Sequence, residues 1–173
     1  MELILKLNPG NITDEVAATL PTRFAARGVV FDEYNNIALL PVTAHNYYKL
    51  PGGGIEEGED RIEAFRRECL EEIGTDVEVV QELGTVVEYR AEFSLVQTSY
   101  CYMAKAIGER KEAVFTEHEL ENGFQDALWV PLDKGIELME SEAENYKGKF
   151  VVERDMFLLK KVKTGGTEYL DRP

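Results

Sequence analysis

A glycine-rich loop followed by closely spaced glutamates is the part of this sequence that could carry out chemistry. Three glutamates in the second half of the expected helix, Glu68, Glu71 and Glu72, fall within an arc of about 100° at about 100° per residue. Carboxylate oxygens on one face are the ligands that a hard cation prefers, so these side chains are candidates for holding Mg²⁺, with Mn²⁺ as the alternative ion. The plainer alternative for a Glu-Glu pair is a solvated helix face.

This spacing also brings like charges together, which costs a few tenths of a kcal/mol per pair. Neither Glu71 nor Glu72 has a basic residue three or four positions downstream that would offset the repulsion. A bound divalent cation is the natural compensation. Together with the glycine loop at a fixed distance upstream, the cluster therefore predicts a metal platform.

The upstream glycines suit such a site. Gly52, Gly53 and Gly54 have no Cβ, so their carbonyls and amides can approach a metal or a phosphate closely. Arg67 is expected to hold this loop, or Glu59, through a bidentate pair. We assign Arg67 a structural role on this basis.

Further candidates lie outside the glutamate helix. Arg23 and Arg27 flank the first strong strand and could reach phosphates, with ordinary surface charge as the alternative. Glu119, in an acidic stretch expected to be a loop, could add a substrate contact, a ligand or a base, with a solvated loop as the alternative. His45 and His118 show no partner spacing and are assigned no role. The aromatic residues that could stack on a base, with core packing as the alternative, are Tyr47, Tyr48, Phe93 and Trp129.

The length and net charge of the chain limit the classes of partner that we expect. The chain has 173 residues, the usual size of one domain, so residues 1–173 are expected to form a single domain. Its 33 acidic and 19 basic residues give a net charge of −14, which repels phosphate backbones and acidic membrane surfaces. We expect no nucleic-acid polymer and no membrane as partners. A small nucleotide or nucleotide derivative remains compatible, because a bound cation inverts the local charge.

Cysteine usage and the first residues suggest a compartment. Cys69 and Cys101 are the only cysteines, and neither lies in a CxxC pair or near clustered histidines. The apolar run at the N-terminus is too short for a signal peptide, and no stretch approaches the roughly 20 apolar residues of a membrane span. A reducing cytoplasm is the expected location.

Periodicity and turn residues outline the elements that must position these groups. The glutamate helix is expected over Asp60 to Ile73, ended by Gly74. Leu50 to Gly54 and Glu117 to Gly123 are expected to be loops, Thr13 to Leu20 is left unassigned, and residues 164–173 are expected to fray. Strands are expected at Leu3 to Leu7, Phe24 to Phe31, Ile37 to Pro41, Val77 to Val80, Gly84 to Arg90, Ser94 to Ile107 and Leu128 to Val130, and further helices at Leu132 to Met139 and Phe150 to Val162.

The stretch from Gly53 to Thr75 resembles the Nudix box: Gly, five residues, Glu, seven residues, Arg-Glu, an aliphatic residue, any residue, Glu-Glu, any residue, Gly, and an aliphatic residue. Every glycine and polar position matches, which covers Gly53, Glu59, Arg67 and Gly74 as well as the three glutamates. The departures are Cys69 and Thr75 at the aliphatic sites, where Cys69 can pack as a small hydrophobe. The resemblance spans 23 residues and implies an α/β fold, a Nudix-type alpha/beta/alpha sandwich with a central mixed β-sheet.

The resemblance also implies a function. Glu68, Glu71 and Glu72 would be magnesium ligands and catalytic residues, the carbonyl of Gly52 would complete the metal site, and water would attack phosphorus in a nucleoside diphosphate derivative. Glu68 is the first choice as general base. Hydrolysis of modified nucleoside triphosphates such as 8-oxo-dGTP and of nucleotide sugars or other capped diphosphates both stay open. The alternatives are a nucleotide-sensing domain without turnover and a purely structural or interaction module. The sequence does not fix the oligomeric state, and the resemblance implies a homodimer as the assembly to test.

Overall fold

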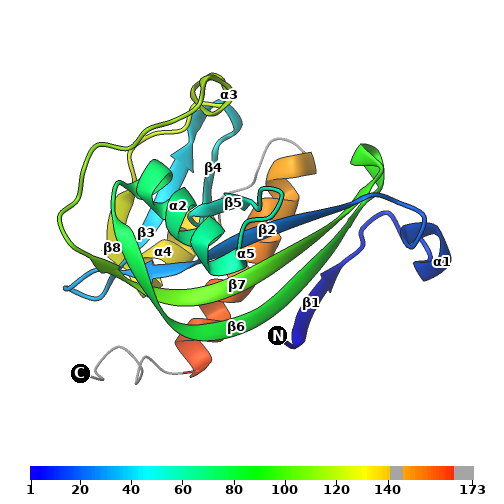
Figure 1. Cartoon of the computed structure of the whole chain (residues 1–173), viewed down its shortest axis with the longest axis horizontal. Coiled ribbons are helices and arrows are strands. Elements are labelled where there is room, and N and C mark those ends of the chain that lie inside the picture. The colour runs from blue at the N-terminus through cyan, green and yellow to red at the C-terminus, as the bar shows by residue number, and fades with distance from the viewer. Residues whose placement is uncertain (141–145, 166–173) are drawn as a thin grey trace.

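A single mixed sheet forms the centre of the computed structural model, which describes residues 1–140 and 146–165 (Figure 1). The strand order is β1-β6-β7-β2-β3-β4, with β5 paired to β2 and β8 paired to β3. The pairs β1–β6 and β2–β7 are parallel and the other pairs are antiparallel, which confirms the expected mixed sheet. The strands are β1 (Leu3–Leu7), β2 (Thr22–Phe31), β3 (Asn36–Val42), β4 (Tyr47–Lys49), β5 (Gly52–Gly54), β6 (Asp76–Arg90), β7 (Leu95–Ile107) and β8 (Leu128–Pro131).

Helices cover both faces of this sheet. On one face, α2 (Arg61–Ile73) packs Phe65 and Cys69 against strand residues such as Val30. On the other face, α4 (Leu132–Met139) and α5 (Tyr146–Gly165) enclose a second apolar cluster that includes Val29 and Leu158. Figure 1 shows α2 on one side of the strands and α5 on the other. The alpha/beta/alpha sandwich is therefore confirmed, and so is the packing of Cys69, which is fully buried.

The glutamate helix has the ends that its sequence predicts. The Asp60 side chain accepts hydrogen bonds from the amides of Ile62 and Glu63, which caps the first turn of α2. Gly74 ends the helix with φ of 67°, a left-handed conformation that glycine adopts without steric cost. These caps fix where the following strand leaves the helix, and they hold the glutamates on its last two turns.

Two predictions about the sheet were wrong. The glycine stretch is a strand, β5, and not a loop: Gly52, Gly53 and Gly54 pair with β2 in antiparallel register. A Cβ at Gly52 would meet the carbonyl oxygen of Ala26 at 2.3 Å, so only glycine lets β5 lie this close to β2. The two strands expected between residues 77 and 90 are one continuous strand, β6, whose register against β7 shifts twice instead of breaking at a turn.

The helices differ from expectation in three places. The stretch Glu117 to Gly123, expected to be a loop, contains α3 (Glu117–Glu121), because Thr116 and Glu119 form a capping box. A four-residue helix, α1 (Asp14–Ala17), lies in the segment left unassigned. Helix α5 runs to Gly165, and the rest of the expected tail, residues 166–173, lies outside the described residues.

None of the helices in the described ranges has the length and apolar character that crossing a membrane requires.

Candidate functional site

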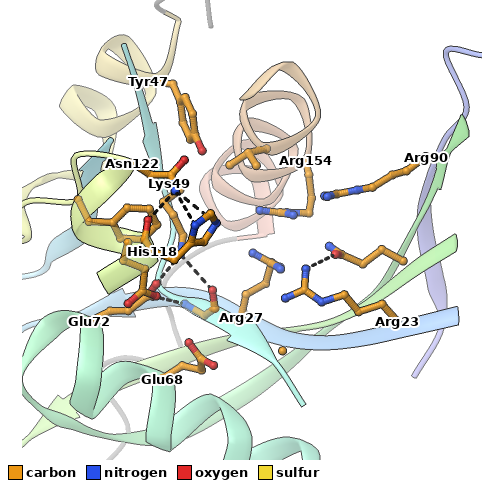
Figure 2. A pocket seen from close by; sticks show the side chains of 17 residues that line it. Arg23, Arg27, Tyr47, Lys49, Glu68, Glu72, Arg90, His118, Asn122 and Arg154 are labelled. Carbon is orange, nitrogen blue, oxygen red and sulfur yellow. Dashed lines mark hydrogen bonds and ion pairs between the residues drawn. The ribbon is translucent and has the colours of Figure 1, made fainter. Parts of the chain in front are cut away.

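A cavity of about 240 Å³ opens where β4, β5 and the last turns of α2 meet β2, β6, β7 and α5 (Figure 2). Its two sides carry opposite charge. Glu68 and Glu72 lie on one side, and the arginine side chains lie on the other. The residues that line it are Arg23, Arg27, Tyr47, Lys49, Gly52, Gly53, Gly54, Glu68, Glu72, Arg90, Gln97, His118, Glu119, Asn122, Phe124, Val151 and Arg154.

The structure brings two of the three predicted glutamates to this cavity. Glu68 and Glu72 are 8% and 1% exposed and line it, whereas the Glu71 side chain is 45% exposed and does not. A Cβ at Gly53 would lie 2.3 Å from Oε2 of Glu68, so the glycine leaves the space that this carboxylate fills. Within residues 1–140 and 146–165, no three acidic, histidine or cysteine side chains are gathered around one point as metal ligands would be.

A lysine stands between the predicted metal ligands. Lys49 Nζ donates to Oε1 of Glu72 at 2.5 Å and to the carbonyl oxygen of Gly52 at 3.2 Å. The other oxygen of Glu72 accepts from the Gly52 amide at 2.7 Å. A positive charge is thus already held by two of the oxygens expected to bind a cation. The donor set, two buried carboxylates and a backbone carbonyl, is all oxygen, which is the chemistry that Mg²⁺ accepts. The residues present therefore fit the ion.

Arg67 ties the segment from Gly54 to Glu59 to the glutamate helix. It makes a bidentate pair with Glu59, at 2.8 and 3.0 Å, and donates to the carbonyl of Gly54 at 3.0 Å. The same guanidinium contacts Glu68 at 2.9 Å and Glu71 at 3.2 Å. The repulsion among the glutamates is thus offset by Arg67, four residues upstream of Glu71, and by Lys49 on Glu72. The prediction that a metal ion alone offsets this repulsion was therefore incomplete, because neither basic partner lies downstream of the glutamates on the helix.

Burial and pairing shift the pKa values of these carboxyl groups in opposite directions. Burial raises the pKa of Glu68 and of Glu72, and for Glu72 the ammonium of Lys49 opposes the rise. The hydrogen bond from Arg67 lowers the pKa of Glu59. Burial therefore makes the negative charge of Glu68 and of Glu72 costly, and a cation bound beside them would lower that cost.

The basic side of the cavity contains residues that the sequence argument missed. Arg27 was predicted, but Arg90 and Arg154 were not, and Figure 2 shows all three on the side away from Glu68 and Glu72. Arg23 is exposed and donates to Oε1 of Gln97 at 3.4 Å. A signal was available for Arg154: it lies three residues after Val151 and four before Leu158, on the apolar stripe of α5.

Helix α3 contributes the remaining predicted residue. Glu119 lines the cavity, and its Oε2 accepts from the amide and hydroxyl of Thr116 at 2.8 and 2.9 Å. His118, which was assigned no role, lines the same cavity. The T-x-x-E spacing of Thr116 and Glu119 is visible in the sequence and would have predicted this cap.

The fold and the site together define a three-layer α/β protein in which an acidic helix and a group of arginines face one cavity. A family model described as NUDIX domain matches residues 21–151. The chain therefore belongs to the Nudix family.

Individual relatives agree with this membership. An 8-oxo-dGTP diphosphatase of Proteus vulgaris is 42% identical over 65 residues, which is 35% of this chain and 58% of that protein. An RNA pyrophosphohydrolase of Wolbachia pipientis subsp. Culex pipiens (strain wPip) is 29% identical over 85 residues, or 48% of this chain and 51% of that protein. The chain thus spans between half and three fifths of these two curated relatives. A solved NUDIX hydrolase from Nitrosomonas europaea superposes with a TM-score of 0.64 at 16% identity, covering 84% of this chain and 90% of that one, which shows a shared fold.

Proposed function

We propose that this protein is a magnesium-dependent hydrolase that cleaves a diphosphate linkage in a nucleoside triphosphate or another nucleoside diphosphate derivative. The observation that carries this proposal is the cavity itself, which joins buried carboxylates at one end to guanidinium groups at the other. A phosphorylated substrate bound with a divalent cation needs both kinds of group, because the cation takes oxygen ligands and the phosphate takes arginine donors. Family membership and the similarity to a diphosphatase and a pyrophosphohydrolase support it.

The proposed roles rest on the Nudix resemblance and, except for Glu71, on position at the cavity. Glu68, Glu71 and Glu72, with the carbonyl of Gly52, would hold the ion. When bound, the ion lowers the pKa of a water molecule and neutralises phosphate charge. Glu68 is our choice for the group that takes the proton from the attacking water, since it is buried beside Gly53 and faces the cavity.

The remaining groups bind and orient. Arg23 and Arg27 would contact phosphate oxygens, and Glu119 would contact the substrate from α3. Arg67 would keep Glu59 and the β5 carbonyl of Gly54 in place, so that the glutamates stay at a fixed distance from the substrate.

The proposal is tested with a substrate panel and one matched pair of variants. The panel, assayed with Mg²⁺, contains 8-oxo-dGTP, a nucleotide sugar and a 5′-triphosphorylated RNA. Glu72→Gln is expected to lower kcat by at least about 100-fold, because it removes a charged oxygen ligand. Glu63→Gln is the control, because Glu63 is exposed on the same helix and does not line the cavity. Circular dichroism should show that both variants remain folded.

Two results would contradict the proposal. A wild-type kcat in Glu72→Gln would show that the glutamate site takes no part in the reaction. Absence of turnover with every substrate, combined with nucleotide binding, would favour the alternative of a sensing domain.

A further inference from the structure

Three buried arginines meet at the basic end of the cavity. Arg27 from β2, Arg90 from β6 and Arg154 from α5 are 5%, 5% and 1% exposed, and all three line the cavity. Burying a guanidinium is costly unless it is paired and its donors are used. Three of them at one place therefore require compensation.

The ion pairs and hydrogen bonds of the described residues supply only part of this compensation. Arg90 donates to Oε1 of Glu88 at 2.8 Å, and Arg154 donates to Oδ1 of Asp155 at 2.6 Å and to Oε2 of Glu88 at 3.5 Å. Arg27 donates through Nε to Ser99, a neutral hydroxyl, at 3.3 Å. Three guanidinium groups thus face two buried carboxylates, which leaves an excess of one positive charge in this cluster.

Some of the arginine donors also lack an acceptor. Within residues 1–140 and 146–165, three buried side-chain polar atoms have no hydrogen-bond partner, and two of them are Nε of Arg90 and Nη2 of Arg154. Leaving such an atom buried without a partner destabilises the fold. Burial, and secondly repulsion from Arg154, lower the pKa of Arg27 to about 10, the direction expected for a buried guanidinium with little compensating charge. An anion in the cavity would supply the missing charge, and it would reach these two enclosed donors once the guanidinium groups turn toward it.

We propose that Arg27, Arg90 and Arg154 bind a terminal phosphoryl group that follows the scissile diphosphate linkage, so that the enzyme prefers nucleoside triphosphates or longer polyphosphates to nucleotide sugars. This inference rests on the proposed function. The guanidinium groups come from three different elements, and a terminal phosphoryl group presents three oxygens in a tetrahedral arrangement, whereas a carboxylate presents two in one plane. A neutral sugar at this end of the cavity could accept hydrogen bonds through its hydroxyl oxygens, but it would leave the excess positive charge as it is.

Glu88 positions the cluster. It is fully buried on β6 and accepts from Arg90, from Arg154 and, at 2.7 Å, from Gln97. Because its carboxylate is engaged by these neighbours, it orients the arginines while leaving their remaining donors for a ligand.

The first test measures anion binding without catalysis. Inorganic tripolyphosphate is titrated into the full chain by isothermal calorimetry, in EDTA and without a divalent cation. Wild type is expected to bind it, and Arg27→Gln is expected to bind at least about tenfold more weakly, since a charge-assisted pair is lost. Arg66→Gln is the matched control, because Arg66 is an exposed arginine that pairs with Asp76 away from the cavity, and it should bind as wild type does.

The second test measures selectivity. With Mg²⁺, kcat/KM is determined for a nucleoside triphosphate and for the diphosphate sugar of the same nucleoside. The ratio of the two values is expected to fall at least about tenfold in Arg27→Gln and to stay unchanged in Arg66→Gln. If Arg27→Gln does not fold, Arg154→Lys serves instead, since it keeps the charge beside Asp155 and loses the forked donors.

The outcomes separate the two proposals. Tripolyphosphate binding that is absent in wild type, or that is equal in wild type and the arginine variant, overturns the phosphoryl site while substrate turnover can still support the hydrolase. Arginine-dependent tripolyphosphate binding without turnover of any nucleotide overturns the proposed function, and with it the role of this site in substrate selection.

Discussion

Lys49 lies between two of the groups that we propose as metal ligands. Its ammonium group contacts both Glu72 and the carbonyl of Gly52, two of the oxygens expected to bind the cation. Without such a partner, Glu72 would be a buried and unpaired carboxylate, which is strongly destabilising. On the proposed function, Lys49 would therefore stabilise the metal-free protein and compete with the ion.

Removing this competitor should tighten metal binding. In Lys49→Gln, the dissociation constant for Mn²⁺, measured by electron paramagnetic resonance without nucleotide, is expected to fall several-fold, because no ammonium must leave Glu72 first. The metal-free variant should also unfold at lower urea concentration than wild type. Lys134→Gln, which removes an exposed lysine paired with Glu137, should change neither property. Weaker Mn²⁺ binding in Lys49→Gln would show that Lys49 supports the ion instead of competing with it.

The glutamate side of the site could be predicted from sequence because it depends on local spacing. Glu68 and Glu72 lie on one helix, and helical periodicity places them together. The arginine side depends on long-range packing: Arg27 and Arg154 are 127 residues apart in the numbering and line one cavity because α5 packs against β2. Arg154 on an apolar stripe was a visible anomaly, but the sequence could not say which residues it would face.

Among the elements, β5 shows how a backbone can shape the site. Its glycines let the strand lie against β2 on one side and against the Glu68 carboxylate on the other. The strand was predicted as a loop because glycine has low strand propensity. Tertiary contact overrides that propensity here, since a side chain at Gly52 or Gly53 would collide with its neighbours.

Gly53→Ala should therefore damage the site more than the fold. The added Cβ would lie 2.3 Å from the Glu68 carboxylate, which must turn away, and we expect kcat to fall at least about tenfold with a smaller loss of thermal stability. Gly54→Ala is the comparison, because its Cβ would first meet the flexible end of Arg23 at 3.3 Å. Assays of both variants should show the larger loss in Gly53→Ala, and equal losses would mean that the Glu68 position is not what Gly53 protects.

The bounds of some of the other elements could be predicted from local sequence, and the bounds of others could not. Helix α4 has the bounds that its sequence predicts, and α2 differs only in that Asp60 is its cap. The continuity of β6 was missed because Gly84, with φ of 135°, resembles a turn residue but sits at a register shift. Boundaries of this kind depend on pairing with β7, which local sequence does not encode.

At the scale of the whole molecule, an acidic chain encloses a cluster of buried arginines. The net charge is −14, yet Arg27, Arg90 and Arg154 are buried together. Long-range repulsion of anions should therefore slow the arrival of a highly charged substrate, while the cavity holds it once it arrives. The two effects act at different distances, so the net charge does not determine what the cavity can bind.

The stability of this centre should depend on pH through Glu88. Burial by itself would raise its pKa, but Arg154, Arg90 and Arg27 outweigh burial and lower it below the ordinary value of 4.5. Above the unfolded-state pKa, Glu88 is charged in both states and its pairing stabilises the fold. As the pH falls, the unfolded chain takes up a proton first, and the stabilisation is lost as the pH passes through the lower folded-state pKa.

Glu88→Gln should remove this pH-dependent stabilisation. Above about pH 6, the variant should be less stable than wild type by about 3–5 kcal/mol, the general cost of breaking a buried ion pair, and the difference should shrink below about pH 4.5. Glu68 and Glu72, whose raised pKa values act in the opposite direction, are common to both proteins and cancel. Urea denaturation across this range provides the measurement. Glu82→Gln, an exposed site on the same strand, is the control and should show a small difference at every pH. A Glu88→Gln difference that stays constant as the pH falls would mean that the arginines depend on Glu88 for packing and not for its charge.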